Sequence, residues 1–125
     1  MILVACIDEN NGMLFNNRRQ SRDKGLIEHI IAMNKKVWIN NFSKELFEGY
    51  GNVYVDDEFA SNFGSEDICF VENIPLSSLV NRATKIILYN WNKKYPADRH
   101  IDISLDDWCL VSECEFSGTS HDKIK

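Results

Sequence analysis

MILVACI, residues 1–7, opens the chain as a continuous apolar run and passes into DENNGMLFNN, residues 8–17. A short apolar run without polar alternation is typical of a strand that is buried on both faces, as the strands of parallel sheets are. Asn and Gly favour turns because they tolerate positive φ angles and form local hydrogen bonds, so residues 8–17 are expected to form a loop. The opening of the chain therefore predicts a central strand followed by a turn.

Helical and strand-like segments alternate after this opening. Apolar residues recur at helical spacing from Leu26 to Met33, which predicts a helix that has Ser21 or Asp23 as its N-cap and ends near Asn34. This alternation predicts an α/β layered domain with a mostly parallel sheet. The other expected elements are strands at residues 36–40, 51–55, 68–71, 85–91 and 108–116, helical segments at 43–49 and 75–83, and a frayed tail at 117–125.

The second of these helical segments, residues 75–83, begins at Pro75, which suits the first turn of a helix. For the segment at 43–49, Asn41 and Ser43 are the expected N-terminal caps and Gly49 the expected C′ residue. The connections between the expected elements are short. Residues 1–125 are therefore expected to form a single domain.

The composition limits the classes of protein to which the chain can belong. The 125 residues are 44% hydrophobic and 26% charged, with a formal net charge of -5. These fractions are those of a globular domain, and no apolar run approaches the roughly 20 residues of a transmembrane helix. The negative balance argues against a nucleic-acid partner, because nucleic-acid-binding domains normally carry a basic face. The N-terminus lacks the layout of a signal peptide, so a cytoplasmic protein without membrane contact is expected.

The four cysteines are expected to be buried thiols. Cys6 and Cys69 lie in apolar segments, where a cysteine usually packs as a small hydrophobic residue. Cys109 and Cys114 have no second Cys or His pair at the spacing of zinc ligands. A metal or redox role is the alternative, and no metal site is predicted.

Three stretches of the sequence resemble the dihydrofolate reductase family. VACIDENNGMLFNN, residues 4–17, is similar to the family's first strand and loop. KKVWINNFSKELF, residues 35–47, lies where the family has a strand and the start of a helix, and residues 85–113 resemble its late strand, turn and next strand. The resemblance implies a three-layer domain with a mostly parallel central sheet and flanking helices. It also implies NADPH-dependent reduction of dihydrofolate.

The resemblance assigns possible roles to four residues. Counting back from the strand at residues 36–40 puts Lys24 at the position of the family's catalytic carboxylate, and a shift of one residue puts Asp23 there. In an active enzyme Asp23 would be catalytic, Cys6 and Ile27 would line the substrate pocket, and Ser43 would keep a role at the cofactor. The alternative for Asp23 is an N-terminal helix residue that is stabilised by the helix dipole.

Several family features are replaced or absent in this sequence. Arg19-Gln20-Ser21 stands where the family has Leu-Pro-Trp, and Arg99 falls where a Thr supports the carboxylate. Asn40-Asn41-Phe42-Ser43 replaces a Gly-Arg-x-Thr phosphate-binding sequence. Residues 72–87 contain no glycine for the second phosphate-binding element, so tight NADPH binding is not expected. The family also continues into a last strand beyond residues 121–125, so an open sheet edge is expected here.

These departures favour a catalytically degenerate relative of dihydrofolate reductase that acts as a small acidic binding or regulatory protein, with a phage or mobile element as a suggested origin. Its expected partner is a protein, which binds at the open sheet edge or is a second copy of the chain. Arg18 and Arg19 belong to a basic cluster suited to an acidic partner, and Trp91 is an interface candidate if its ring is exposed. The alternatives are an active NADPH-dependent dihydrofolate reductase, or a module that binds a pterin or nucleotide without turnover.

Overall fold

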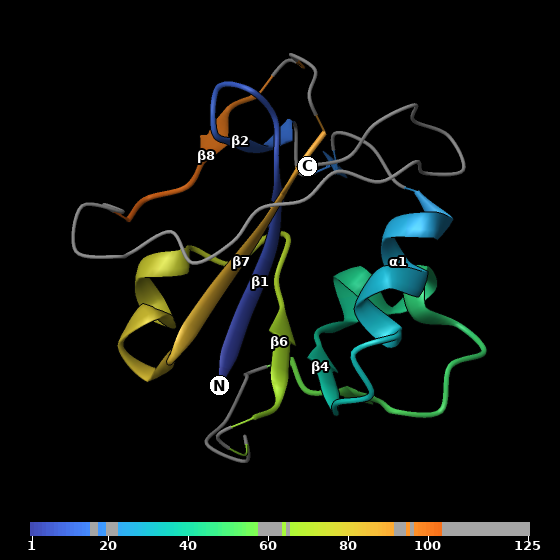
Figure 1. The fold of residues 1–125 in the computed structure, drawn as a ribbon. Helices are drawn as coiled ribbons and strands as arrows, with labels where there is room; N and C mark the ends of the chain where they lie inside the picture. Colours follow the sequence, from blue (N-terminus) through green and yellow to red (C-terminus); the bar gives the residue numbers. More distant parts are fainter. Residues whose placement is uncertain are drawn as a thin grey trace.

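The computed structural model describes residues 1–15, 18–19, 23–57, 64, 66–91, 95 and 97–103. Its centre is a five-stranded parallel sheet, which confirms the predicted α/β class (Figure 1). The strand order is β5-β4-β6-β1-β7. These strands are β1 (Ile2–Ile7), β4 (Val37–Ile39), β5 (Val53–Val55), β6 (Ile68–Phe70) and β7 (Lys85–Asn90).

The two faces of β1 supply two separate hydrophobic cores. Ile2 and Val4 pack in the core beneath the helix α1, whereas Leu3 and Ala5 pack in the core on the other face. This alternation follows from the two-residue period of a strand, and it explains why the opening run is apolar throughout. Figure 1 shows α1 on one side of the central strands and the yellow helical turns on the other, which gives three layers.

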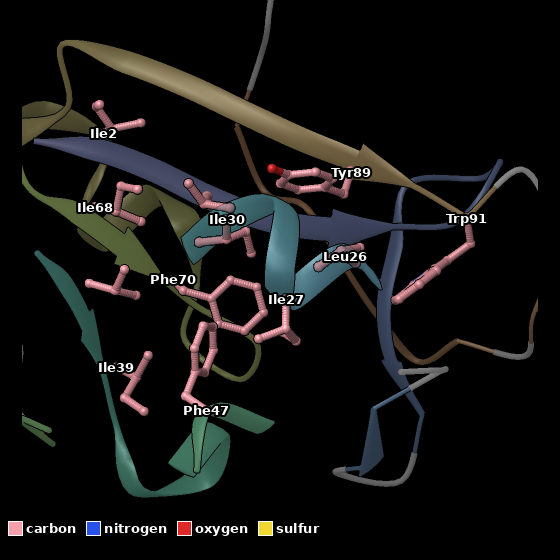
Figure 2. Packing of buried hydrophobic residues seen from close by; sticks show 12 residues of the cluster. Ile2, Leu26, Ile27, Ile30, Ile39, Phe47, Ile68, Phe70, Tyr89 and Trp91 are labelled. Atoms are coloured by element: carbon pink, nitrogen blue, oxygen red, sulfur yellow. The ribbon is translucent and has the colours of Figure 1, made fainter. Parts of the chain in front are cut away.

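The helix α1 (Lys24–Ile31) begins and ends close to the predicted positions. Asp23 is its N-cap, as one of the two predicted alternatives required, and Asn34 follows its end with a left-handed φ of 56°. In Figure 2 the buried side chains Leu26 and Ile27 project from α1 toward the core that contains Phe70. None of the helices in the described ranges has the length and apolar character needed to cross a membrane.

The two other predicted helical segments form 3₁₀ turns rather than α-helices. The first segment forms η1 (Asn41–Phe47), and the second forms η2 (Leu76–Ser78) and η3 (Val80–Arg82). The predicted N-terminal caps of the first segment, Asn41 and Ser43, are wrong, because its N-cap is Asn40, whose side chain makes no capping bond in the described structure. The Asn41 N–H instead donates to the Asp57 carboxylate at 2.8 Å. Gly49 has a φ of 87°, as its predicted C′ position requires.

A second, antiparallel sheet corrects the prediction of a loop over residues 8–17. It has the order β3-β2-β8 and consists of β3 (Arg18–Arg19), β2 (Gly12–Phe15) and β8 (Arg99–His100). The turn is confined to the polar residues before β2, where the Asp8 carboxylate accepts the N–H groups of Asn10 and Gly12, each at 2.8 Å. Met13 and Leu14 are buried, so β2 forms where the sequence becomes apolar again. The predicted strand at 108–116 and the tail at 117–125 lie outside the described residues.

Candidate functional site

The strand order places a crevice between β1 and β6 at their carboxyl ends. From β1 the chain continues to β4 across β6, whereas from β6 it continues to β7 across β1. The connections that leave these two neighbouring strands therefore run in opposite directions along the sheet. Open α/β sheets bind ligands at the point where the direction of the connections reverses. Cys6 lies near the end of β1 and Glu72 follows β6, so both are at this crevice.

Most of the residues predicted from the resemblance meet in one small cavity at this crevice. Cys6, Asp23 and Ile27 line it together with Trp91 and Glu72. The cavity has a volume of about 10 Å³, which is room for a single water molecule. The structure therefore brings the proposed catalytic and substrate-binding positions together but leaves little space between them. Its other lining residues are Leu26, Leu46 and Phe70.

Asp23, rather than Lys24, lies at the cavity. The Asp23 residue is 4% exposed, and Lys24 is the exposed first residue of α1. The Asp23 carboxylate also caps the helix, because its Oδ1 accepts the N–H groups of Gly25 at 2.7 Å and Leu26 at 3.3 Å. The capping role predicted for this aspartate is therefore present, and its position at the cavity also suits the catalytic alternative.

Glu72 forms a partly buried ion pair with Arg19 at this crevice. Its Oε2 accepts from Nε of Arg19 at 2.9 Å, and its Oε1 accepts from a terminal guanidinium nitrogen of Arg19 at 3.3 Å. The Ser43 hydroxyl donates to the same Oε1 at 2.7 Å. The Glu72 side chain is 9% exposed and the Arg19 side chain 17%, so the pair is largely shielded from solvent.

This arrangement changes the role assigned to Ser43. The residue is fully buried and donates its hydroxyl to Glu72, so it does not cap η1 as predicted. A hydroxyl engaged in this way is also turned toward the carboxylate and not toward solvent. The Ser43 hydroxyl therefore helps to hold a buried acid in this structure.

The electrostatics of the crevice follow from this burial. Burial lowers the pKa of the Arg19 guanidinium, but its hydrogen bonds and charge interactions with Glu72 and Glu45 raise that pKa above its ordinary value overall. Burial, together with the negative charge of Glu72, raises the pKa of the Cys6 thiol well above its ordinary value. Burial likewise raises the pKa of Cys69 to about 12. Both thiols are free and protonated at neutral pH. Cys69 is buried as predicted, whereas Cys6 is half-buried.

An open groove lies on the outer side of the ion pair. This outer groove has a volume of about 630 Å³ and is formed by β3 and η1. Arg18 and Lys44 are exposed there, whereas Arg19 directs its charge to Glu72 and Glu45. The two arginines predicted as interface residues therefore differ in availability. The lining residues are Arg18, Arg19, Asn41, Phe42, Lys44, Glu45 and Glu48.

Trp91 does not meet the condition for an interface anchor. It is 3% exposed and packs in the core beside α1, as Figure 2 shows at the end of β7. Asparagines on both sides of Trp91 in the sequence favour exposure, but its apolar ring is buried against the cavity. Cys109 and Cys114 lie outside the described residues. Within the described ranges, no three His, Cys, Asp or Glu side chains are grouped so that they could hold a metal ion.

Sequence reasoning missed Glu72 as the organising acid of the crevice. The available signal was its position directly after the buried strand predicted at residues 68–71. A charged residue at the carboxyl end of a parallel strand lies where such sheets place their ligand sites. Its partner Arg19 is 53 residues away in the sequence, and no local pattern predicts that pairing.

Comparison of the sequence with models of known protein families gives no match, and comparison with curated proteins gives no match either. The description of the site therefore depends on its geometry.

Proposed function

We propose that this chain is a dihydrofolate-reductase-like scaffold that binds a protein partner and does not reduce folate. The order of its elements supports the likeness: the apolar first strand and its turn are followed, after the short strands β2 and β3, by a helix, a strand and a helical segment, the order expected from the family that the sequence resembles. Fold and activity separate readily, since activity depends on the site that a scaffold carries. Whether the crevice has room for a substrate is therefore the observation that decides between binding and catalysis.

The filled crevice is the observation that carries this proposal. Sites for small molecules enclose roughly 300–1,000 Å³, whereas the cavity beside Asp23 has a volume of about 10 Å³. Arg19 lines the outer groove, and its ion-pair partner Glu72 lines the cavity. A cavity of this volume has no room for a pterin ring beside Asp23.

The positions expected to hold a cofactor also favour partner binding over catalysis. Hydride transfer requires the nicotinamide to be held against the substrate, and the protein's contribution is this positioning. Ser43 is committed to Glu72, and the connection after β6 contains no glycine that lets a backbone approach a phosphate. We therefore propose no cofactor for this chain.

The proposed partner is an acidic protein surface that contacts the outer groove. Arg18 and Lys44 present exposed positive charges there, next to the exposed acids Glu45 and Glu48, in a chain whose net charge is -5. Exposed cations steer the acidic groups of a partner to their own positions on a surface. Arg19 contributes less to this steering because Glu72 and Glu45 already compensate its charge.

A charge-reversal experiment tests this interface. The chain carries a photo-activated cross-linker at Asn41, an exposed residue in the outer groove, and is incubated with extract of its source cells. We expect excess unlabelled chain to compete for the captured protein, and Arg18→Glu/Lys44→Glu to fail to compete. Lys24→Glu/Lys85→Glu is the control, since it reverses two exposed charges outside the groove. Equal competition by the two double variants would exclude the groove as the interface.

An active reductase is the second candidate. It is favoured by the meeting of Asp23, Cys6 and Ile27 in one buried cavity. The test is the loss of NADPH absorbance in the presence of dihydrofolate, with Asp23→Asn as the variant that removes the acid. We expect no turnover by the wild-type chain. Turnover that disappears in Asp23→Asn would establish the reductase instead.

A homodimer through the sheet edge is a second way to bind a protein. Among the described strands, β5 is at one end of the central sheet, and its Tyr54 and Val55 are 41% and 44% exposed. Unpaired backbone groups at an edge are a template for pairing with another chain. A melting temperature that rises with protein concentration would support this dimer, and a constant value would rule it out.

A further inference from the structure

The guanidinium group of Arg19 is held on several sides by the chain itself. Both carboxylate oxygens of Glu72 accept from it, and the Phe42 carbonyl accepts from it at 2.8 Å. Glu45 forms a further ion pair on the solvent side. The Arg19 Cζ atom lies 5.0 Å from the centroid of the Phe42 ring. These groups, Glu72, Glu45 and Phe42, are called the guanidinium cradle.

The geometry of the cradle selects a guanidinium over a simple ammonium. A planar fork of N–H groups donates to the two oxygens of one carboxylate at once, and its face stacks on an aromatic ring. A point charge such as a lysine ammonium does not make the paired contacts and the stacking together. The cradle supplies all of these partners: two oxygens of one acid, a second acid, a carbonyl and a ring.

The cradle lies at the boundary between two spaces. Arg19 lines the outer groove, and Glu72 lines the small cavity beside Asp23. The ion pair therefore joins the lining of the outer groove to the lining of the cavity. Removal of Arg19 leaves Glu72 buried and uncompensated, which is costly until another cation takes the place.

We propose that the cradle is a guanidinium-binding site, that Arg19 fills it from within the chain, and that Arg19 thereby latches the crevice closed. The ligand class that exchanges with Arg19 is a guanidinium group, such as the side chain of an arginine that enters from the outer groove. This site is distinct from the position of Asp23 and does not require that the chain bind a folate.

The test removes the Arg19 side chain from the cradle and measures whether a free guanidinium ion binds in its place. We expect Arg19→Ala to lower the melting temperature by roughly 10 °C, as the loss of one partner of a buried pair implies. Millimolar methylguanidinium should restore part of this loss in a saturable way, and methylammonium at the same ionic strength should not. The matched control is Arg18→Ala, which removes an exposed charge from the same groove and should respond to neither ion.

Equal responses of Arg19→Ala to the two ions, or no response to either, would overturn the proposal. If Arg19→Ala does not fold, the comparison moves to Arg19→Lys and Arg18→Lys. Both variants keep the charge and lose the planar fork, so Arg19→Lys should be the less stable of the two. Equal melting temperatures of Arg19→Lys and the wild-type chain would show that no guanidinium is recognised.

Discussion

At the scale of single residues, the Glu72 carboxylate determines which side chains can occupy the crevice. It is buried, and its two oxygens accept hydrogen bonds from Arg19 and Ser43. A buried carboxylate of this kind is stable only while its donors remain. The contribution of each donor is therefore measurable by removing it alone.

Ser43→Ala removes one donor without adding a charge. A hydrogen bond to a charged group contributes about 1.5–3 kcal/mol, so we expect a loss of that order in the free energy of unfolding. Ser43→Asp should be worse, because it places a second negative charge beside Glu72. Urea unfolding at neutral pH measures both variants, with Ser78→Ala as a control at an exposed serine. If Ser43→Asp were as stable as the wild-type chain, a helix-capping role for Ser43 would be indicated instead.

The carboxyl group of Asp67 makes the stability of the folded chain depend on pH in the acid range. Burial raises the pKa of its carboxyl, but donation from the Gly64 and Trp38 N–H groups and the charge of Lys36 lower that pKa below its ordinary value overall. A lowered pKa in the folded chain means that Asp67 contributes stability above the unfolded pKa of about 4. This contribution is lost as the pH falls through the lower, folded pKa.

The corresponding prediction compares Asp67→Asn with the wild-type chain in urea unfolding from pH 7 to acid. The variant should be less stable at pH 7, and the difference should shrink as the pH falls below about 4. Glu66→Gln is the neighbouring control, because its ion pair with Lys35 is exposed and contributes little. A difference that stays constant over the whole range would contradict the assignment of the stabilising charge to Asp67.

At the scale of elements, α1 depends on Asp23 for its first turn. Asn caps helices about as well as Asp, whereas Ala costs about 1 kcal/mol. We therefore expect Asp23→Asn to unfold with nearly wild-type stability and Asp23→Ala to lose about that amount. Thermal unfolding monitored by circular dichroism measures both. Equal losses in the two variants would show that the negative charge, and not the capping hydrogen bonds, is what stabilises the helix.

The elements differ in how far the sequence predicts them. The strands β1 and β7 and the helix α1 are predicted because their own apolar patterns determine their burial. The short strands β2 and β8 are not predicted, because pairing between Gly12 and His100 joins segments far apart in the chain. Similarly, 3₁₀ geometry in η1 is not visible in its sequence, since its first N–H is satisfied by Asp57, which lies in the turn after β5.

At the scale of the whole molecule, the sequence predicts the layers but not the state of the site. The alternation of strands and helices is enough for a parallel sheet covered on both faces. The resemblance to dihydrofolate reductase points to Cys6, Asp23 and Ile27, which do meet in one cavity. The contact between Arg19 and Glu72 at that cavity is not predictable, because Arg19 lies in the second sheet, Glu72 follows a strand of the central sheet, and the two share no local pattern.

We propose that the crevice beside Asp23 no longer binds the ligands of a reductase, and a thermal melt is the direct test of this. The chain is unfolded alone and with saturating NADPH, dihydrofolate or methotrexate. A ligand at about 100 times its Kd adds roughly 2.7 kcal/mol to the stability of the folded state, which is a readily visible shift. The account predicts no shift with any of the three compounds. A clear shift with NADPH or methotrexate would contradict it and would show that the crevice opens to the family's ligands.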